Sequence, residues 1–265
     1  MTYCVGLLLE AGLVFASDSR TNAGVDYIST YSKMHVFQPA ADRLFVLMTA
    51  GNLGTTQAVV NRIRRDIDDQ ALEKDPEAVR GDSAADAGGE KPTLLTARYL
   101  FEAADYVGRL SVAVQKEFSP SLRQAGASGE ASFILGGQIA GQPHGLTMIY
   151  PQGNAIMATP ETPFLQIGES KYGKPPLDYV GHSGLSLEDA ARLCLVSEIV
   201  TRRSNLTVGP PFEIAMVPRD ALKVTRRLKL EKDSPEIIRA MEVWANNMKE
   251  VLHRLPRFSW EQDPL

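Results

Sequence analysis

The sequence predicts an α+β fold in which helices face two antiparallel β-sheets. Short apolar runs bounded by turn residues come first along the chain, and two helical patterns follow them. Strands and helices then recur without the regular alternation that is typical of a parallel sheet. The 265 residues are 44% hydrophobic and 23% charged, which is enough apolar material for a substantial core. We favour one domain spanning 1–265 over two smaller ones.

The first half of the chain predicts a hairpin, two further strands and a helix. In the hairpin, two short apolar runs flank the turn residues Glu10, Ala11 and Gly12. The expected ranges are 2–18 for the hairpin, 32–37 and 44–49 for the strands, and 55–67 for the helix. Residues 68–92 are acidic, contain glycine and lack aromatic side chains, so we expect an exposed insertion there.

The second half predicts further strands and helices, with turns rich in glycine, proline and asparagine between them. Helices are expected at 94–118, ending before Pro120, at 186–202 and at 235–253, and strands at 131–139, 145–150, 154–158, 212–217 and 222–230. Residues 164–168 form a short apolar stretch. A polar loop should follow Gly168. The C-terminal helix and tail begin near residue 235, and the apolar stripe of that helix fits either a core face or a contact between subunits.

The charge balance argues against nucleic acid and membranes as partners. The chain has 28 Lys and Arg against 32 Asp and Glu, which gives a formal net charge of −4. It therefore lacks the overall basic character that attracts phosphate backbones and anionic lipids. The N-terminal apolar run has no basic segment before it and is interrupted by Glu10, which is not typical of a signal peptide, so we expect a cytoplasmic protein.

The cysteines and histidines do not predict a metal site. Cys4 and Cys194 lie far apart in the sequence, and neither they nor the four histidines show the spacing of metal ligands. We expect no metal and no cofactor.

The N-terminus combines residue types that suit amide hydrolysis. Such a reaction needs a nucleophile, a base near the proton of that nucleophile, and donors aimed at the developing oxyanion. If Met1 is removed, the α-amine of Thr2 lies on the same residue as its hydroxyl and can accept the hydroxyl proton. An α-amine has a pKa of about 7.7–8.0, so a nearby cation makes it a competent base at neutral pH.

Three other residues could complete this site. Lys33 could supply the cation, and Asp18, at the end of the second hairpin strand, could hold Lys33 in place. Gly51 ends a strand in a turn, where a residue without Cβ lets a backbone N–H approach a substrate. Each residue alone has an ordinary structural explanation, and only their combination favours catalysis.

The order of these residues resembles a known family. The run Thr2-Tyr3-Cys4-Val5-Gly6, the segment 12–21, Lys33 and Thr49-Ala50-Gly51 together resemble the N-terminal third of proteasome β-subunits and of their simpler bacterial relatives. Over essentially the whole chain, the order of elements is most similar to Anbu, the bacterial ancestral β-subunit. The resemblance implies the four-layer αββα sandwich of N-terminal nucleophile hydrolases. It also implies identical subunits in a ring or ring-like spiral that encloses the active sites.

The resemblance implies a role for each candidate. Thr2 is the nucleophile and base, Lys33 tunes it, Asp18 orients the lysine, and the Gly51 amide binds the oxyanion. Side-chain specificity is expected from a pocket whose walls include Thr21, Tyr31, His35, Thr49 and Leu53.

Two departures from the family pattern bear on activity. Gly168-Glu169-Ser170 stands where proteasome β-subunits usually have Gly-Ser-Gly, so Glu169 and Ser170 join the candidate catalytic set. Residues 204–208 are a loose counterpart of a later Asp-x-x-Ser-Gly stretch and lack its aspartate. Three functions therefore stay open: a threonine-type hydrolase of peptide or amide bonds that requires removal of Met1, a weakly active or inactive scaffold or shell subunit, and a non-proteolytic amidase.

Overall fold

The computed structural model describes residues 1–22, 28–73 and 91–261 of the chain. All strand pairing in this part of the chain is antiparallel, and the strands form two five-stranded sheets and one small two-stranded sheet. The mixed α/β class with antiparallel sheets is therefore confirmed.

The first large sheet has the order β10-β1-β2-β11-β12, and the second has the order β5-β6-β7-β8-β9. The first comprises β10 (Phe164–Gly168), β1 (Tyr3–Leu9), β2 (Gly12–Asp18), β11 (Phe212–Pro218) and β12 (Arg226–Leu230). The second comprises β5 (Met34–Ala40), β6 (Arg43–Gly51), β7 (Ala131–Ile139), β8 (Gly145–Ile149) and β9 (Ala155–Met157). The small sheet pairs β3 (Arg20–Asn22) with β4 (Ile28–Thr30).

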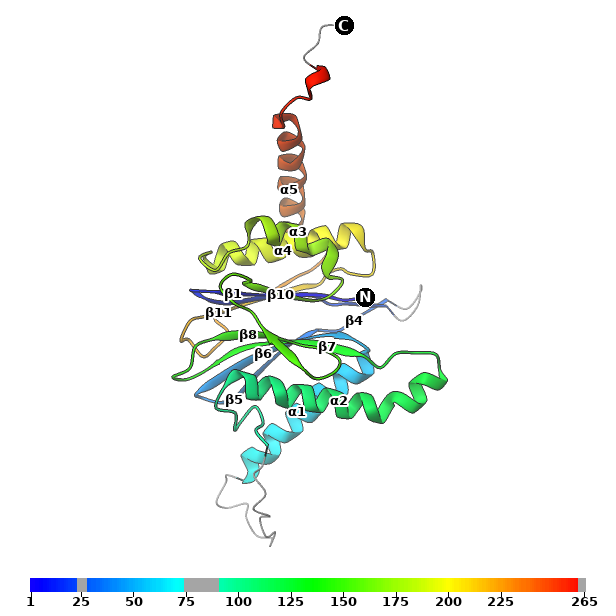
Figure 1. Ribbon diagram of the computed structural model, residues 1–265, viewed down its shortest axis with the longest axis vertical. Helices are drawn as coiled ribbons and strands as arrows, with labels where there is room; N and C mark the ends of the chain where they lie inside the picture. The colour runs from blue at the N-terminus through cyan, green and yellow to red at the C-terminus, as the bar shows by residue number, and fades with distance from the viewer. Residues whose placement is uncertain (23–27, 74–90, 262–265) are drawn as a thin grey trace.

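Helices lie on the outer side of each large sheet (Figure 1). Helices α3 (Ser170–Val180) and α4 (Leu187–Ser204) cover the first sheet. Helices α1 (Leu53–Glu73) and α2 (Leu100–Gln124) cover the second. The two large sheets face each other between these helix pairs.

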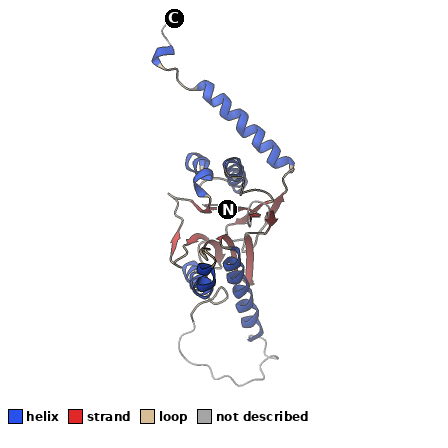
Figure 2. Ribbon diagram, turned by 90° about the vertical axis from the view of Figure 1, so that its right-hand side faces the viewer, coloured by secondary structure: helices blue, strands red, loops and turns tan. Residues whose placement is uncertain are grey.

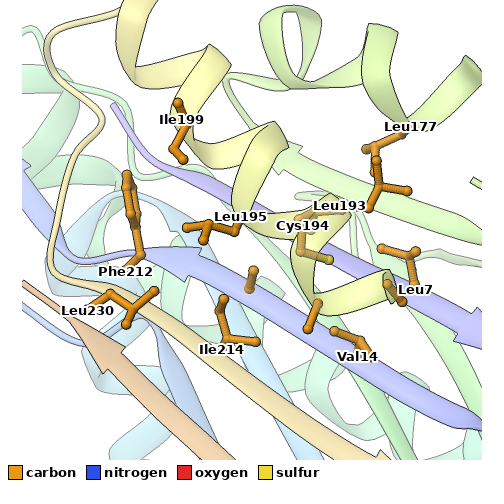
Figure 3. Close-up of a cluster of buried hydrophobic side chains, with 14 of the residues drawn as sticks. Leu7, Val14, Leu177, Leu193, Cys194, Leu195, Ile199, Phe212, Ile214 and Leu230 are labelled. Atoms are coloured by element: carbon orange, nitrogen blue, oxygen red, sulfur yellow. The ribbon is translucent and has the colours of Figure 1, made fainter. Parts of the chain in front are cut away.

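Three apolar cores hold these elements together. Val14 on β2 packs toward α4 among the side chains of the first core, several of which Figure 3 shows. The next residue, Phe15, points to the opposite face and joins the core between the two sheets. Phe133 on β7 lies in the third core, under α1 and α2. Because β1 and β2 are buried on both faces, their sequences are nearly continuous apolar runs.

Helix α2 differs at both ends from the helix predicted over 94–118. Helix α2 begins at Leu100, where the Glu102 carboxylate accepts hydrogen bonds from the backbone N–H groups of Arg98 and Tyr99 and so caps the start. It also continues past Pro120. Pro120 and Lys116 are exposed, so the Lys116 carbonyl that loses its helical donor can be hydrated.

The polar segment after Gly168 is helix α3 and not the expected loop. Its buried residues, Gly173, Pro176 and Leu177, pack into the structure despite two prolines within the helix, so tertiary packing overrides local propensity here. Helix α1 continues to Glu73, so residues 68–73 of the expected insertion are helical. Residues 74–90 of that range lie outside the described part of the chain.

Helix α5 (Pro235–Arg254) projects away from the body of the protein (Figures 1 and 2). Ile237 is its one buried residue, and the 3₁₀ turn Ser259–Glu261 follows it. The apolar side chains farther along are exposed, including Ile238, Met241, Val243, Met248, Val251 and Leu252. The core-face interpretation therefore holds only at the start of this helix.

None of the helices in residues 1–22, 28–73 and 91–261 combines the length and the apolar character needed to cross a membrane.

Candidate active site

The strand order brings four chain segments to one edge of the first sheet. Thr2 immediately precedes β1, Asp18 ends β2, and Gly168 ends β10. Gly209 lies just before β11. Because neighbouring strands run antiparallel in the order β10-β1-β2-β11, these ends all meet at the same side of the sheet.

Asp18 and Lys33 form a buried ion pair at this edge. Lys33 Nζ lies 2.6 Å from Asp18 Oδ1 and also donates to the Arg20 carbonyl at 2.6 Å. The side chain of Asp18 is completely buried, and that of Lys33 is 6% exposed. The backbone of Tyr3, adjacent to Thr2, donates to Asp18 Oδ1 at 3.0 Å, and the Gly209 N–H donates to Oδ2 at 3.2 Å. Both carboxylate oxygens are therefore hydrogen-bonded.

Burial and hydrogen bonding shift the pKa of Asp18 in opposite directions. Burial raises the pKa of the Asp18 carboxyl above its ordinary value, while the ammonium of Lys33 and the two backbone N–H donors lower it. The charged form of Asp18 thus depends on these three donors, and Lys33 has the largest share.

The field of Lys33 reaches the start of the chain. The pKa of the Met1 α-amine is lowered, first by burial and then by the charge of Lys33, while Asp18 and Glu169 oppose the shift. The residue directly before Thr2 therefore lies within electrostatic reach of this pair. With Met1 in place, the nitrogen of Thr2 is a peptide amide and has no basic lone pair.

Glu169 belongs to the same cluster. Its backbone N–H donates to the Thr2 carbonyl at 2.7 Å, and its buried side chain accepts a hydrogen bond from Asn205 Nδ2 at 2.8 Å. Lys171 Nζ lies 3.7 Å from the other carboxylate oxygen. Ser170, the first residue of α3, instead lines a separate pocket together with Phe164.

Gly51 ends β6, next to the strand that begins after Lys33. The backbone N–H of Thr49, two residues earlier on β6, donates to the Lys33 carbonyl at 3.0 Å. Gly51 has a φ of +111°, and a Cβ added there would lie 2.3 Å from the Glu130 carbonyl oxygen. This position therefore requires glycine for backbone reasons alone.

A pocket of about 630 Å³ opens beside Lys33. Four of the five predicted wall residues line it, namely Tyr31, His35, Thr49 and Leu53. Thr21 does not line it, and its buried hydroxyl has no hydrogen-bond partner within the described residues. Burial, together with the charge of Arg64, lowers the pKa of His35 to about 4, so this histidine is neutral at pH 7.

Several residues that contact the site were missed by the sequence analysis. Asn205, which holds Glu169, lies in the segment 204–208 that was noted only for lacking an aspartate, and Gly209, which holds Asp18, directly follows that segment. The hydroxyls of Tyr3 and Ser197 are 2.6 Å apart, and Ser197 donates to the Gly173 carbonyl, which fixes the start of β1. Glu198 follows Cys194 by one helical turn on the buried side of α4, a spacing that could have indicated a buried acid.

Glu198 is completely buried, and neither carboxylate oxygen has a hydrogen-bond partner within the described residues. Burial raises the pKa of Glu198 well above its ordinary value, the charge of Asp18 raises it further, and Lys33 opposes the shift. The folded chain therefore retains a proton that the unfolded chain releases above its own pKa of about 4.3. The stability that Glu198 contributes is accordingly greatest at low pH and falls as the pH rises above that value.

Glu198→Met removes this carboxyl at similar volume. We expect the variant to gain about 1–3 kcal/mol in free energy of unfolding at pH 8, and less at pH 4.5. Urea denaturation at both pH values and at equal protomer concentration measures this. Glu10→Met, at an exposed position in the turn between β1 and β2, is the control. A loss of stability in Glu198→Met, or an equal gain in both variants, would contradict the prediction.

Comparison with known proteins identifies the family. No family model matches the sequence, and no curated protein matches it. Solved structures match over nearly the full length. An Anbu (Gly-1) mutant from Hyphomicrobium sp. strain MC1 is 38% identical, with a TM-score of 0.82, and the match covers 98% of this chain and 100% of that one. Anbu from Yersinia bercovieri is 37% identical, with a TM-score of 0.81 and coverage of 97% and 100%.

A third structure, described as a helical assembly of the Anbu complex from Pseudomonas aeruginosa, is 39% identical, with a TM-score of 0.82 and coverage of 99% and 100%. Identity at this level over nearly all of both chains is sufficient to assign a family. The chain belongs to the Anbu family of ancestral β-subunits.

Proposed function

We propose that this chain is a threonine-type N-terminal nucleophile hydrolase that cleaves peptide or amide bonds once Met1 has been removed. The observation that carries the proposal is the buried Lys33–Asp18 ion pair, which is hydrogen-bonded to the residue adjacent to Thr2. In this proposal the two sheets and four helices correspond to the four-layer αββα sandwich of that enzyme class within a single domain over 1–265.

The reaction begins at the Thr2 hydroxyl. Its oxygen attacks the substrate carbonyl carbon, and its proton passes to the free α-amine of Thr2. Lys33 lowers the pKa of an amine at this site, as its effect on the Met1 α-amine indicates, so the neutral, basic form is available at pH 7. The Gly51 N–H stabilises the oxyanion. The amine then gives its proton to the leaving nitrogen, and water hydrolyses the acyl-enzyme ester.

Glu169 has a supporting role in this proposal. Its carboxylate opposes the effect of Lys33 on the pKa of the Met1 amine, so at a processed terminus it would stabilise the ammonium that forms when the Thr2 amine accepts the hydroxyl proton. Asn205 holds that carboxylate in position. Glu169 thereby provides a carboxylate near the amine although residues 204–208 lack the aspartate of the family pattern. Ser170 contributes through its place at the start of α3, next to Glu169.

An electrophilic trap tests the nucleophile. We expect the Met1-free protein to gain the mass of one epoxyketone or β-lactone molecule per chain on Thr2, because the free α-amine activates the hydroxyl of the same residue toward such electrophiles. Intact-mass and peptide mass spectrometry measure the adduct. Thr2→Ala should show none, and Thr96→Ala, at an exposed threonine, should label fully. A Met1-free chain that never labels would refute the hydrolase function.

A scaffold or shell subunit with little activity is the second candidate. It is favoured by Glu169, a carboxylate where proteasome β-subunits usually have a hydroxyl group. The same Thr2→Ala variant separates the two functions. Loss of amide turnover with unchanged particle size would reject a purely structural role. Turnover of small amides without peptide cleavage would indicate the non-proteolytic amidase.

We also propose that α5 contacts a second copy of this chain. The exposed apolar stripe of the helix, together with a groove of about 550 Å³ bounded by α4, β11, β12 and the start of α5, provides an apolar surface suited to assembly. The description of the Pseudomonas aeruginosa Anbu structure as a helical assembly supports self-association of identical subunits.

Charge on the stripe should disrupt this assembly. We expect Leu252→Glu, at a side chain that is 65% exposed, to shift the particle toward single chains because it places a carboxylate in an apolar contact. Light scattering coupled to size-exclusion chromatography measures the mass. Asn246→Glu, at an exposed polar position of the same helix, is the control. An unchanged mass for Leu252→Glu would exclude this surface.

A further inference from the structure

The pocket beside Lys33 has an unbalanced charge. Its lining includes three cationic side chains, Lys33, Arg64 and Arg227, and no aspartate or glutamate. The remaining walls mix polar groups, such as the hydroxyls of Tyr31 and Thr49, with apolar ones. The charge of the pocket therefore depends on which of the three cations is paired with a carboxylate from outside the pocket.

Two of the three cations are already paired. Lys33 is paired with Asp18 at 2.6 Å, and Arg227 is paired with the buried Glu213 at 2.7 Å. Arg64 forms one side-chain hydrogen bond and no ion pair within the described residues, and that bond is a long one of 3.5 Å to the neutral amide oxygen of Asn61. The charge of Arg64 is therefore not balanced by a carboxylate within this part of the chain.

The effect of Arg64 extends into the pocket. After burial, Arg64 is the largest cause of the lowered pKa of His35, so its positive potential is felt at the pocket wall. A neutral imidazole there can donate a hydrogen bond, as can the hydroxyls of Tyr31 and Thr49. A bound carboxylate would meet one unpaired guanidinium and several neutral donors, whereas an ammonium group would meet repulsion.

We propose that this pocket binds the acidic side chain, aspartate or glutamate, that precedes the scissile bond of a peptide substrate, and that Arg64 determines this preference. The inference rests on the proposed function, because Lys33 at the pocket wall is paired with Asp18, which accepts a hydrogen bond from the residue after Thr2. A purely apolar preference is the competing outcome, since Met34, Val36 and Val60 also line the pocket.

A binding measurement tests the pocket without catalysis. In the Met1-free Thr2→Ala assembly, fluorescence anisotropy compares two labelled, C-terminally amidated tripeptides that differ only in ending with glutamate or glutamine. The amidated end makes the glutamate side chain the sole difference in charge. We expect about 10-fold tighter binding of the glutamate peptide at low salt, since a charge-assisted hydrogen bond replaces a neutral one.

Substitutions at neighbouring arginines assign the effect. Arg64→Gln should reduce the glutamate preference to less than about 2-fold, while Arg65→Gln, one residue along the same helix and outside the pocket, should retain it. Equal binding of both peptides to the unmodified pocket, or a preference that survives Arg64→Gln, would overturn the assignment.

Reactivity of Thr2 then separates the two proposals. Epoxyketones ending in glutamate, leucine or lysine are compared by their labelling rates. Fastest labelling by the glutamate probe supports the pocket assignment, and fastest labelling by the leucine or lysine probe overturns it while leaving the hydrolase function intact. Selective binding of the glutamate peptide with no labelling by any probe would support the pocket and contradict the hydrolase.

Discussion

Lys33→Met is expected to abolish labelling and turnover at Thr2 and to lower the free energy of unfolding by about 3–5 kcal/mol. Methionine matches the length of the lysine stem but cannot donate to Asp18 or to the Arg20 carbonyl, both 2.6 Å from Lys33 Nζ. The buried Asp18 carboxylate then keeps only two backbone donors. Activity is lost separately, because the amine of Thr2 no longer experiences a nearby positive charge.

The stability loss should depend on pH. Burial raises the pKa of Asp18, and without the opposing charge of Lys33 this pKa rises still further. The folded variant therefore binds a proton that the unfolded chain has released. The variant is therefore destabilised least near pH 5 and increasingly as the pH rises toward 8. Urea denaturation at matched protomer concentration measures this trend.

Two further variants isolate the role of the ion pair. The double variant Lys33→Met/Asp18→Asn should recover part of the stability, because an uncharged amide replaces the unpaired carboxylate, but it should recover no labelling. Lys116→Met, at an exposed lysine, should change neither quantity. If Lys33→Met behaved like Lys116→Met, the ion pair would have no role in either folding or catalysis.

The sequence predicted the half of the site that local patterns encode. The first hairpin follows from two apolar runs around a turn, and it fixes Thr2 and Asp18 at one sheet edge. Gly51 was predicted from the turn at the end of its strand, and its φ of +111° agrees with that turn. The pocket walls were predicted only through the family resemblance, because no periodicity distinguishes His35 from another half-buried strand residue.

The other half of the site depends on contacts between distant segments. Glu169 reaches Thr2 because β10 pairs with β1, and Gly209 reaches Asp18 because its segment leads into β11 beside β2. These segments are more than 150 residues apart in sequence, and pairing of that kind leaves no local signal. Helix α3 was missed for a related reason, since its prolines indicate a loop and only its packing stabilises the helix.

Gly168→Ala is the second substitution with a large expected effect. Gly168 ends β10 with a φ of +85°, and a Cβ added there would lie 2.0 Å from the carbonyl oxygen of Thr2. Because the added Cβ would collide with a backbone atom, which cannot rotate away as a flexible side chain can, either β10 or the residue carrying the nucleophile must move. The same carbonyl accepts the Glu169 N–H at 2.7 Å, so this movement also disturbs the carboxylate next to the N-terminal amine.

Backbone strain from the positive φ and the collision with Thr2 should both lower the stability of the Gly168→Ala variant. We expect Gly168→Ala to lower the free energy of unfolding by roughly 2–5 kcal/mol and to slow labelling of Thr2 by about 10²-fold, the loss associated with a displacement of about 1 Å.

Gly141→Ala is a matched control, because Gly141 has a φ of +78° with open space around its missing Cβ. The control should lose only about 1–3 kcal/mol and should label at the normal rate. Because both variants carry the same type of backbone strain, slowed labelling in Gly168→Ala alone would assign the effect to contact with Thr2. Equal rates in the two variants would mean that the end of β10 does not position the nucleophile.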